Sequence, residues 1–266
     1  MAKHLLIDQA GAALLWRLIE LEKAPWRKAG RRPLLWWRDD DARRPSHGLD
    51  RLLRLSRSHD VPLALAVIPD VDLTALGNAI AQFPLVRAMQ HGCDHVDRNA
   101  SGGFSAEFNP AFGEAEIAAA VNAAWRRLSA ATDALPVYAP PWNVLTPNVR
   151  RALRSTSIRA VSLYGATSAV EDGLSEINTH LDIMRWRPPR FRGTLACLAR
   201  LWRQLRARRL GARWNEPIGI LTHHRNLDEA AWSFLEAFLE RTTGPASMFD
   251  WRSAQELIGQ GKGPTG

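Results

Sequence analysis

The amino-acid sequence predicts an α/β fold built on a parallel sheet, and two observations support this prediction. Short apolar and β-rich runs alternate with segments whose apolar residues recur at helical spacing, which is typical of parallel strands joined by crossover helices. No glycine-rich phosphate-binding loop follows the first of these runs, although a dinucleotide-binding fold would carry one there. The sequence therefore favours a barrel over a doubly wound sheet. The strands are expected at residues 33–38, 62–68, 85–90, 135–139, 158–163, 183–186, 217–221 and 247–249.

Helical periodicity is clearest in three segments that lie between the expected strands. Their apolar residues recur every three or four positions, as on one face of an amphipathic helix. These residues are Leu49, Leu52 and Leu53 in the first segment, Ile117, Ala120, Val121, Ala124, Trp125 and Leu128 in the second, and Trp232, Leu235, Phe238 and Leu239 in the third.

The N-terminal segment is expected to be a helix that precedes the barrel. Its apolar stretch is interrupted by Asp8, Arg17 and Glu20, and no small-residue cleavage site follows it, so it does not resemble a signal peptide. We see no repeat and no linker that would separate two domains. The predicted organisation is a helical extension at residues 1–32 and a single barrel domain at residues 33–266.

The composition excludes several classes of protein. Of the 266 residues, 46% are apolar, which is enough to build a sizeable core and too many for a disordered chain. No run of 18 apolar residues occurs, so no membrane span is expected. The two cysteines, Cys93 and Cys197, do not make a disulfide framework and agree with a reducing compartment. We therefore expect a cytoplasmic protein.

The chain is basic, with 35 lysines and arginines against 27 acidic residues and a net charge of +8. This balance favours an anionic partner, or a surface tolerant of one. Much of the excess lies in residues 200–213, where Leu201, Trp202 and Leu205 recur at helical spacing. The arginines of this segment then fall mainly on the outer face of a helix, and a solvated face is the preferred interpretation. No nucleic-acid motif accompanies them, and the sequence does not indicate an oligomeric state.

Side chains able to do chemistry follow the ends of four expected strands. Asp39, Asp40 and Asp41 follow the first strand, and His91 and His95 follow the third. The other members of this set are Pro140, Pro141, Trp142 and Asn143 after residues 135–139, and His223 and His224 after residues 217–221. In parallel barrels the loops at the C-terminal ends of the strands surround one opening, where catalytic residues gather. The sequence therefore predicts a single functional site at this rim.

Two histidines and an acidic cluster indicate a metal site. His91 and His95 are four residues apart, and on a helical turn this spacing puts both imidazoles within reach of one ion. Two histidines and one carboxylate are a usual ligand set for a hydrolytic zinc or similar divalent site. Neighbouring strand residues point to opposite sides, so Asp39 and Asp40 are expected to hold different roles, one on the metal and one beside it. Cys93 is offset from the face of the two histidines and ranks behind Asp40 as a ligand.

Further residues are expected to complete the pocket. Only one of the adjacent histidines His223 and His224 is expected to reach it, and an imidazole there could protonate a leaving amine near neutral pH. The two prolines before Trp142 stiffen a wall, and Trp142 either stacks on a sugar or belongs to the core. The segment around Asp182 could add another wall and a carboxylate.

These motifs resemble the polysaccharide deacetylase (NodB-homology) family, in the same order along the chain from about residue 34 to residue 249. Its aspartate pair resembles Asp39-Asp40, and its His-x-x-x-His pair resembles His91 and His95. The family's Pro-Pro motif resembles residues 140–143, and its Leu-x-His motif resembles residues 221–223. Its Asp-containing segment before a tryptophan is matched loosely by residues 182–186.

The resemblance implies a distorted, incomplete (β/α) barrel and a metal-dependent hydrolase that removes acetyl or similar acyl groups from an N-acylated carbohydrate or related amide. It implies Asp39 as the catalytic base, His223 as the general acid, and a divalent ion, Zn²⁺ first, held by Asp40, His91 and His95. The substrate-binding residues it implies are Pro141, Trp142, Asn143, Asp182, Arg185 and Trp186.

Three departures from the family pattern leave alternatives open. The family usually has Gly-Pro after the aspartate pair, whereas Asp41-Ala42 stands here, so the working pair is either Asp39/Asp40 or Asp40/Asp41, with His224 as an alternate to His223. Gly92 replaces the family's Ser or Thr, and the family's arginine before Pro-Pro is Ala139, for which Arg185 is a candidate substitute. The alternative function is a catalytically degenerate barrel that binds a sugar or an anionic ligand.

Overall fold

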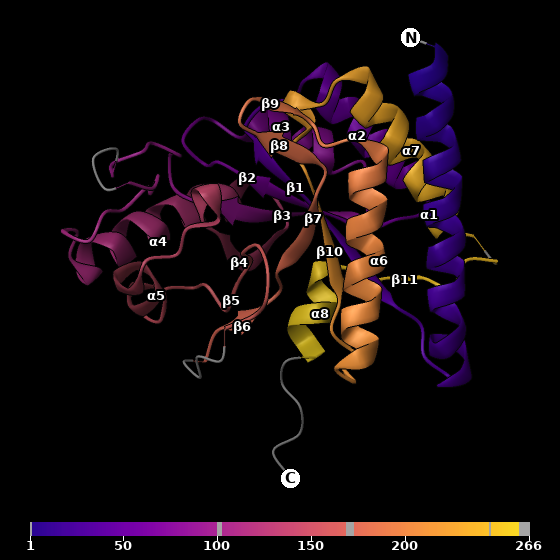
Figure 1. The fold of residues 1–266 in the computed structure, drawn as a ribbon. Helices are drawn as coiled ribbons and strands as arrows, with labels where there is room; N and C mark the ends of the chain where they lie inside the picture. Colours follow the sequence, from indigo (N-terminus) through magenta and orange to yellow (C-terminus); the bar gives the residue numbers. More distant parts are fainter. Residues whose placement is uncertain (1, 100–102, 169–172, 245, 261–266) are drawn as a thin grey trace.

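The computed structural model describes residues 2–99, 103–168, 173–244 and 246–260. A curled, open parallel sheet forms its centre, with the strand order β6-β5-β4-β3-β2-β1-β10-β7 (Figure 1). The sheet does not close into a full barrel, although an isolated parallel bridge between Tyr164 and Thr179 spans its open side. The strands are β1 (Leu34–Ala42), β2 (Leu63–Val67), β3 (Val86–His91), β4 (Ala134–Ala139), β5 (Ala160–Val161), β6 (Ser175–Glu176), β7 (Thr179–Asp182) and β10 (Ile218–Thr222), with β11 (Asp250–Trp251) beside β1.

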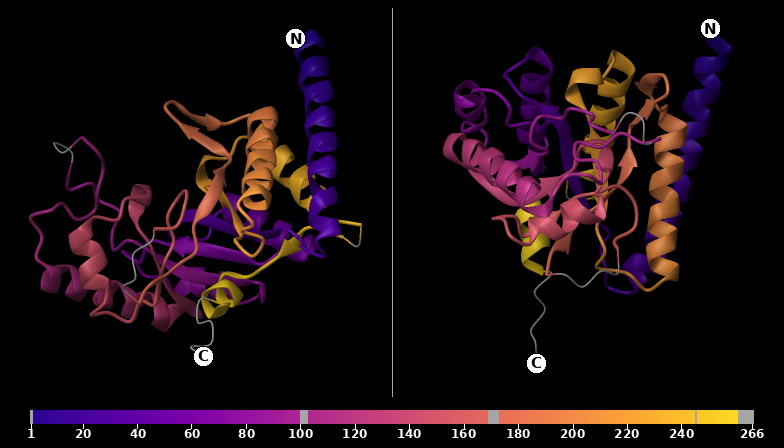
Figure 2. Two further views of the ribbon diagram at one scale, coloured as in Figure 1. Left: turned by 60° about the horizontal axis from the view of Figure 1, so that its bottom comes forward. Right: turned by 90° about the vertical axis from the view of Figure 1, so that its left-hand side faces the viewer.

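Helices connect the strands and, apart from α8, cover the outer side of the sheet, as the sequence predicts for crossover helices (Figures 1 and 2). Two of them begin at side-chain caps, because Ser46 accepts a hydrogen bond from the backbone N–H of Leu49 and Asp228 accepts one from that of Ala231. The helices are α2 (His47–Ser58), α3 (Thr74–Ile80), α4 (Glu114–Ala131), α5 (Pro147–Leu153), α6 (Thr194–Leu210), α7 (Glu229–Thr242) and α8 (Ala254–Gln260), with single 3₁₀ turns η1 (Pro141–Asn143) and η2 (His224–Asn226). None of the helices among the described residues could span a bilayer.

The N-terminal helix α1 (Ala2–Lys28) lies along α6, on the outside of the barrel (Figure 1). A side chain at Gly11 would come within 2.9 Å of Leu195, so glycine permits close approach of the two helices. Buried Glu22 forms an ion pair with Arg209 of α6. The expected helix at residues 1–32 is present, and the proposed division into an extension and a barrel domain stays a prediction.

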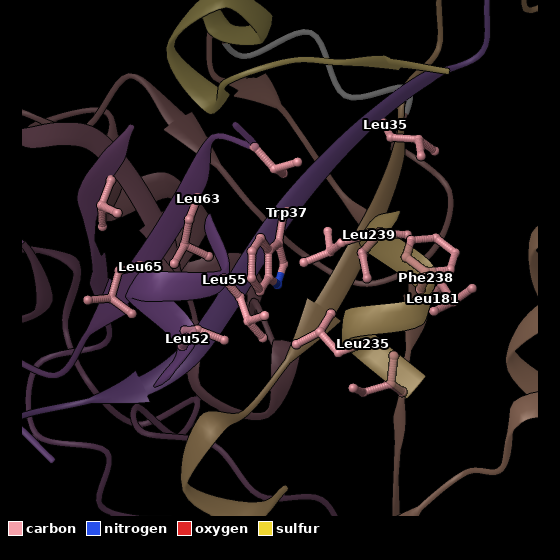
Figure 3. Close-up of a cluster of buried hydrophobic side chains, with 14 of the residues drawn as sticks. Leu35, Trp37, Leu52, Leu55, Leu63, Leu65, Leu181, Leu235, Phe238 and Leu239 are labelled. Carbon is pink, nitrogen blue, oxygen red and sulfur yellow. The ribbon is translucent and has the colours of Figure 1, made fainter. Parts of the chain in front are cut away.

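Alternation along β1 places apolar side chains on both faces of the sheet. Trp37 faces the helices and packs with Leu52, Leu63 and Leu235 (Figure 3). Trp36 faces the opposite, concave side, where it packs in a cluster with residues of α8. Both indole N–H groups are satisfied, since Trp37 Nε1 donates to Thr222 Oγ1 at 2.9 Å and Trp36 Nε1 donates to the Asn178 carbonyl at 3.1 Å. Because β1 is packed on both faces, its orientation is fixed. The sides of the sheet to which Arg38, Asp39 and Asp40 point are therefore fixed as well.

The expected strand at residues 183–186 is wrong as a strand of the central sheet. Residues Met184–Trp186 form β8 of an antiparallel hairpin with β9 (Pro189–Phe191), which stands apart from the sheet. The central strand is the preceding segment, β7, whose sequence Thr-His-Leu-Asp has little apolar character. Its pairing with β10 overrides the weak local signal. The strand expected at residues 158–163 is reduced to β5, and the one at residues 247–249 lies just after, as β11.

Helix α6 largely confirms the outward-facing arginines of residues 200–213. Leu201 and Leu205 are buried, and Arg203 and Arg206 are exposed. Arg208 is the exception, because it is 1% exposed and donates to the backbone carbonyls of Glu216 and Pro217 at 2.8 Å each. This helix also contacts β7 near His180, which is buried beside Arg208.

Burial and the charges of Arg208, Arg213 and Arg200 lower the pKa of His180 to about 3. An unfolded histidine binds a proton below about pH 6.5, so unfolding takes up a proton between that pH and about pH 3. The free energy of unfolding should therefore fall with acidification, by at most about 1.4 kcal/mol per pH unit.

His180→Asn should remove this component of the acid sensitivity. We expect the difference in unfolding free energy between wild type and variant to shrink as pH falls below 6.5, measured by urea denaturation of metal-free protein. His47→Asn, at an exposed position, serves as the control. A difference that stays constant with pH would contradict the prediction.

Candidate metal centre and active site

Three side chains with metal-binding atoms converge at the C-terminal rim of the sheet. His91 Nε2 lies 3.3 Å and His95 Nε2 lies 3.4 Å from Oδ1 of Asp41. One ligand atom from each residue lies within 4.8 Å of the other two. Two imidazole nitrogens and a carboxylate oxygen are a donor set that suits zinc and similar divalent ions and leaves positions open for other ligands. The residues present therefore fit a divalent metal.

A bulge in β1 brings Asp41 to this position. The pairing of β1 with β2 slips between Asp39 and Ala42, where three steps along β1 match two along β2. The extra residue bends the strand, and Asp41 adopts the left-handed conformation with φ of 71°. Strict alternation would have placed Asp41 on the same side as Asp39. The bulge turns it to the concave side instead, beside Asp40.

His91 is the last residue of β3 and is held in a defined orientation. Its Nδ1 lies 2.9 Å from the carbonyl oxygen of Ala139, and a carbonyl can only accept, so Nδ1 carries the proton. Nε2 is then free to bind a metal, an arrangement usual for metal-ligating histidines. Burial disfavours its protonated form, but the charges of Asp40 and Asp41 and a hydrogen bond to Asp41 outweigh this and raise the pKa of His91.

His95 reaches the site through an irregular loop, so the expected helical turn is wrong. Gly92 and His95 both have positive φ, 64° and 60°, and these two left-handed residues fold the chain back on itself. A Cβ at Gly92 would lie 2.6 Å from Pro141 and 2.7 Å from Glu107. This lack of space explains why a glycine follows the first histidine.

Glu107 holds the loop that carries His95. Its Oε1 accepts hydrogen bonds from the backbone N–H groups of Cys93, Asp94 and His95 at 2.7, 2.8 and 2.7 Å. Its Oε2 accepts one from the hydroxyl of Tyr138 at 3.2 Å. The sequence carries no signal for Glu107, because no spacing relates it to the histidines. Cys93 is not a ligand here, since it packs in an apolar cluster and burial raises the pKa of its thiol.

Asp40 faces the same cavity and is bound by an arginine from its own strand. Arg38 Nη2 donates to Asp40 Oδ2 at 3.0 Å, and Arg38 Nε lies 2.9 Å from Oδ1. Residues two apart on a strand share a face, so both side chains point to the concave side. Asp40 Oδ1 is buried and accepts no hydrogen bond from the described residues. Asp40 is thus paired with Arg38 through both oxygens, of which only Oδ2 accepts a hydrogen bond from it.

Arg38, rather than Arg185, is the arginine that contacts Asp40. It is fully buried and also donates to Oγ of Ser162 at 2.7 Å and Oδ1 of Asn143 at 2.6 Å. Arg185 lies exposed on the β8–β9 hairpin and does not line the cavity, so its expected part in the site is not supported by its position. The two-residue spacing of Arg38 and Asp40 is the sequence signal that could have identified this pair.

Asp39 lies on the other side of β1 and does not line the cavity. It is fully buried, and its Oδ2 accepts hydrogen bonds from Thr222 Oγ1 at 2.6 Å and from the backbone N–H of His224 at 2.9 Å. Its Oδ1 pairs with Nδ1 of His224. Burial opposes protonation of His224, but the charge and hydrogen bond of Asp39 outweigh it and raise the pKa of His224. Asp39 and His224 therefore form a buried pair beneath the site, and the geometry favours the Asp40/Asp41 register.

His223 points into the cavity, as alternation with His224 predicts. Its Nε2 lies 3.9 Å from Asp40 Oδ2, and its ring meets that of Trp186 edge-on at 4.4 Å. Nδ1 of His223 is buried without a hydrogen-bond partner among the described residues. Asp182 accepts hydrogen bonds from Trp186 Nε1 and from the backbone N–H of Met184, both at 2.8 Å. The looser motif at residues 182–186 thus adjoins the predicted general acid.

The residues enclose one cavity of about 610 Å³. The ring of Trp142 lies 4.5 Å from that of His95, and Trp142 and Trp186 remain 38% and 42% exposed at the cavity's edge. Pro141 is buried behind Gly92 and does not line it. The lining residues are Asp40, Asp41, His91, His95, Trp142, Asn143, Tyr164, Asp182, Trp186, Arg192, Arg200 and His223.

Comparison with solved structures identifies the fold. A protein from Mycobacterium smegmatis, provisionally assigned as a polysaccharide deacetylase, matches with a TM-score of 0.62 and 17% sequence identity over 87% of this chain and 90% of its own. The chain has the polysaccharide deacetylase fold. The fold that the resemblance implied is thus confirmed.

Two further deacetylase-fold structures differ in activity. A deacetylase solved with its substrate matches with a TM-score of 0.52 and 13% identity over 87% of this chain and 93% of its own. A family 4 carbohydrate esterase pseudoenzyme from Bacillus anthracis also matches with a TM-score of 0.52 and 13% identity, over 85% of this chain and 66% of its own. No protein-family model and no curated protein sequence matches the chain.

The two aspartate registers make different predictions for metal binding. Asp41→Asn should abolish stoichiometric binding of zinc, because it weakens one of the three donors, whereas Asp40→Asn should keep it. Isothermal titration calorimetry with zinc measures both affinities. Metal binding lost in Asp40→Asn and kept in Asp41→Asn would show that the other register is correct.

Glu107 should influence metal affinity without touching the metal. Glu107→Gln removes the charge that binds three backbone N–H groups, and the His95 loop should lose its orientation, with zinc affinity reduced about 10–100-fold. Glu114→Gln, at an exposed position, is the matched control. If the Glu107 variant binds zinc as tightly as wild type, the loop is held by other contacts.

Proposed function

We propose that this chain is a metal-dependent hydrolase that removes acetyl or similar acyl groups from an N-acylated carbohydrate or related amide. The observation that carries the proposal is the convergence of Asp41, His91 and His95 with Asp40 and His223 in one cavity of a deacetylase fold. Under this proposal the chain is a divergent member of the polysaccharide deacetylase family.

In this proposal Asp41, His91 and His95 would hold the metal. Asp41 takes the place that the family resemblance gave to Asp40. When bound, a divalent ion supplies a Lewis acid that polarises an amide carbonyl and makes water more acidic. Zinc is our first choice, because imidazole-rich sites suit it. A family 4 acetyl xylan esterase from Clostridium thermocellum with a TM-score of 0.50 was solved with a cobalt ion, which is consistent with a divalent site in this fold.

Asp40 is the proposed general base. Its Oδ1 is buried, accepts no hydrogen bond from described residues, and shares the cavity with Asp41 and the histidines. The ion pair with Arg38 fixes the orientation of the carboxylate. A carboxylate held in this way can accept a proton from water at the carbonyl carbon. The role passes from Asp39 to Asp40 because only Asp40 faces the cavity.

His223 is the proposed general acid. Its ring lies between Asp40 and Trp186, with Nε2 on the Asp40 side. As an imidazolium, with a proton on each nitrogen, it can donate one proton to the departing amine as the carbon–nitrogen bond breaks and return to the neutral ring. The exposed faces of Trp142 and Trp186 at the edge of the cavity suit a sugar ring.

The alternative is a barrel that binds its ligand without turnover. The pseudoenzyme with the same fold and the altered motifs at Asp41, Gly92 and Ala139 favour this alternative. Stoichiometric metal together with no acetate release from a panel of N-acetylated sugars would decide for the binder.

Activity should depend on Asp40 in a way that separates it from Asp41. Asp40→Asn should keep zinc but lose about 10²–10⁴-fold in kcat, because the base is removed. Asp41→Asn should lose activity and metal together. Acetate release by each metal-analysed variant is the measurement, with Asp60→Asn, at an exposed position away from the cavity, as the carboxylate control. Full turnover in Asp40→Asn would remove it from the mechanism.

A further inference from the structure

Two arginines that the proposed chemistry does not use line the cavity. Arg192 follows β9, and Arg200 lies in the second turn of α6. Helix α6 packs beside β7, at one end of the sheet, whereas Asp41 and His91 come from β1 and β3 nearer its centre. The arginines and the metal donors therefore belong to different walls of the same cavity.

Both guanidinium groups are held in place by contacts that leave N–H groups unused. Arg192 donates from Nε to the carbonyl of Asp182 at 2.8 Å and from Nη2 to that of Met184 at 2.7 Å. Arg200 donates from Nε to the carbonyl of His180 at 3.0 Å, and its guanidinium carbon lies 5.3 Å from the ring centre of Tyr164. Nη1 of Arg192 and both terminal nitrogens of Arg200 donate to no group among the described residues. Arginines fixed in this way lose little further entropy when they bind a ligand.

The charges of these arginines are not neutralised locally. Asp40 is paired with Arg38, and Asp41 lies between two histidines. Asp182 already accepts hydrogen bonds at both oxygens, and burial raises its pKa against the opposing charges of His223 and Arg192. Within the described part of the chain, neither Arg192 nor Arg200 has a carboxylate within the 4.0 Å of an ion pair. A partly buried pair of positive charges without counter-ions is a site for an anion.

We propose that Arg192 and Arg200 bind an oxyanion on the ligand, a carboxylate or a phosphate, so that the substrate is an acidic N-acylated sugar or amide. The claim that the anion is part of a substrate rests on the proposed function. The claim that the arginines bind an anion is independent of it. Guanidinium N–H groups match both carboxylate and phosphate oxygens. The acyl amide would lie at the metal donors and the acidic group at the arginine wall. The pair would thus select acidic ligands over neutral ones.

The test uses three probes that share one N-acetylated sugar ring and differ in charge. N-acetylglucosamine is neutral, N-acetylmuramic acid carries a carboxylate, and N-acetylglucosamine 6-phosphate carries a phosphate. Isothermal titration calorimetry on the full chain, stripped of metal and dialysed free of chelator, measures their affinities without metal–anion contacts or turnover. We expect one acidic probe or both to bind at least about tenfold more tightly than the neutral sugar. Higher salt should weaken the acidic probe selectively.

Substitution assigns the preference to the arginines. Arg192→Gln/Arg200→Gln should bring the acidic probes to the affinity of the neutral sugar, and Arg200→Lys should retain part of the preference. Arg190→Gln, an exposed hairpin arginine outside the cavity, removes the same charge as a matched control. If the double variant does not fold, Arg200→Gln, which loses a single backbone hydrogen bond, carries the test.

The outcomes separate this proposal from the hydrolase proposal. A preference for the carboxylate or the phosphate probe that depends on the arginines supports the anion site and identifies the ligand's acidic group. Equal affinity for all three probes, a preference that survives Arg192→Gln/Arg200→Gln, or one that is undiminished in Arg200→Gln, overturns it. Because binding is measured without metal, failure of acetate release alone would sink the hydrolase and leave the anion site standing.

Discussion

The site depends on one irregularity in the backbone, the bulge that ends β1. Without it, Asp39 and Asp41 would both face the helices, and Asp40 alone would face the cavity. The extra residue turns Asp41 inward, so three consecutive carboxylates occupy three environments. Asp39 is buried against Thr222 and His224, Asp40 is paired with Arg38, and Asp41 meets the two histidines. Like charges that would repel as neighbours are thereby each given a separate partner.

Two buried carboxylates that do not face the cavity, Glu107 and Asp39, hold segments that carry residues facing it. Glu107 gathers three backbone N–H groups beneath the His95 loop, and Asp39 holds the first residue after His223. Each contact orients a neighbouring residue that points inward, so these buried polar groups act on the position of the site. They also meet the requirement that polar groups removed from water keep hydrogen-bond partners. The residues that line the cavity can contact a ligand, and a second set of buried residues behind them holds them in position.

The two walls of the cavity carry different charged groups. Near β1 and β3, Asp40 is already paired with Arg38, and a divalent ion would offset the negative charge of Asp41. Arg192 and Arg200 concentrate positive charge near β7. The rest of the arginine-rich helix α6 faces outward or, at Arg208, into a buried network. The basic character noticed in the sequence therefore reaches the cavity mainly through Arg200, together with Arg192 just before the helix.

The amino-acid sequence by itself determined the α/β class, most strands, the deacetylase resemblance and the histidines His91, His95 and His223, because these follow from periodicity and short motifs. Only the tertiary structure decided which aspartate meets the histidines, since a bulge changes the facing of a side chain without leaving a mark in the local pattern. The tertiary structure also shows that Arg38 rather than Arg185 contacts Asp40, and that β7 rather than residues 183–186 is the strand of the central sheet. It further shows that Glu107 holds the His95 loop. Each of these depends on contacts between segments distant in the chain, which spacing within one segment cannot report.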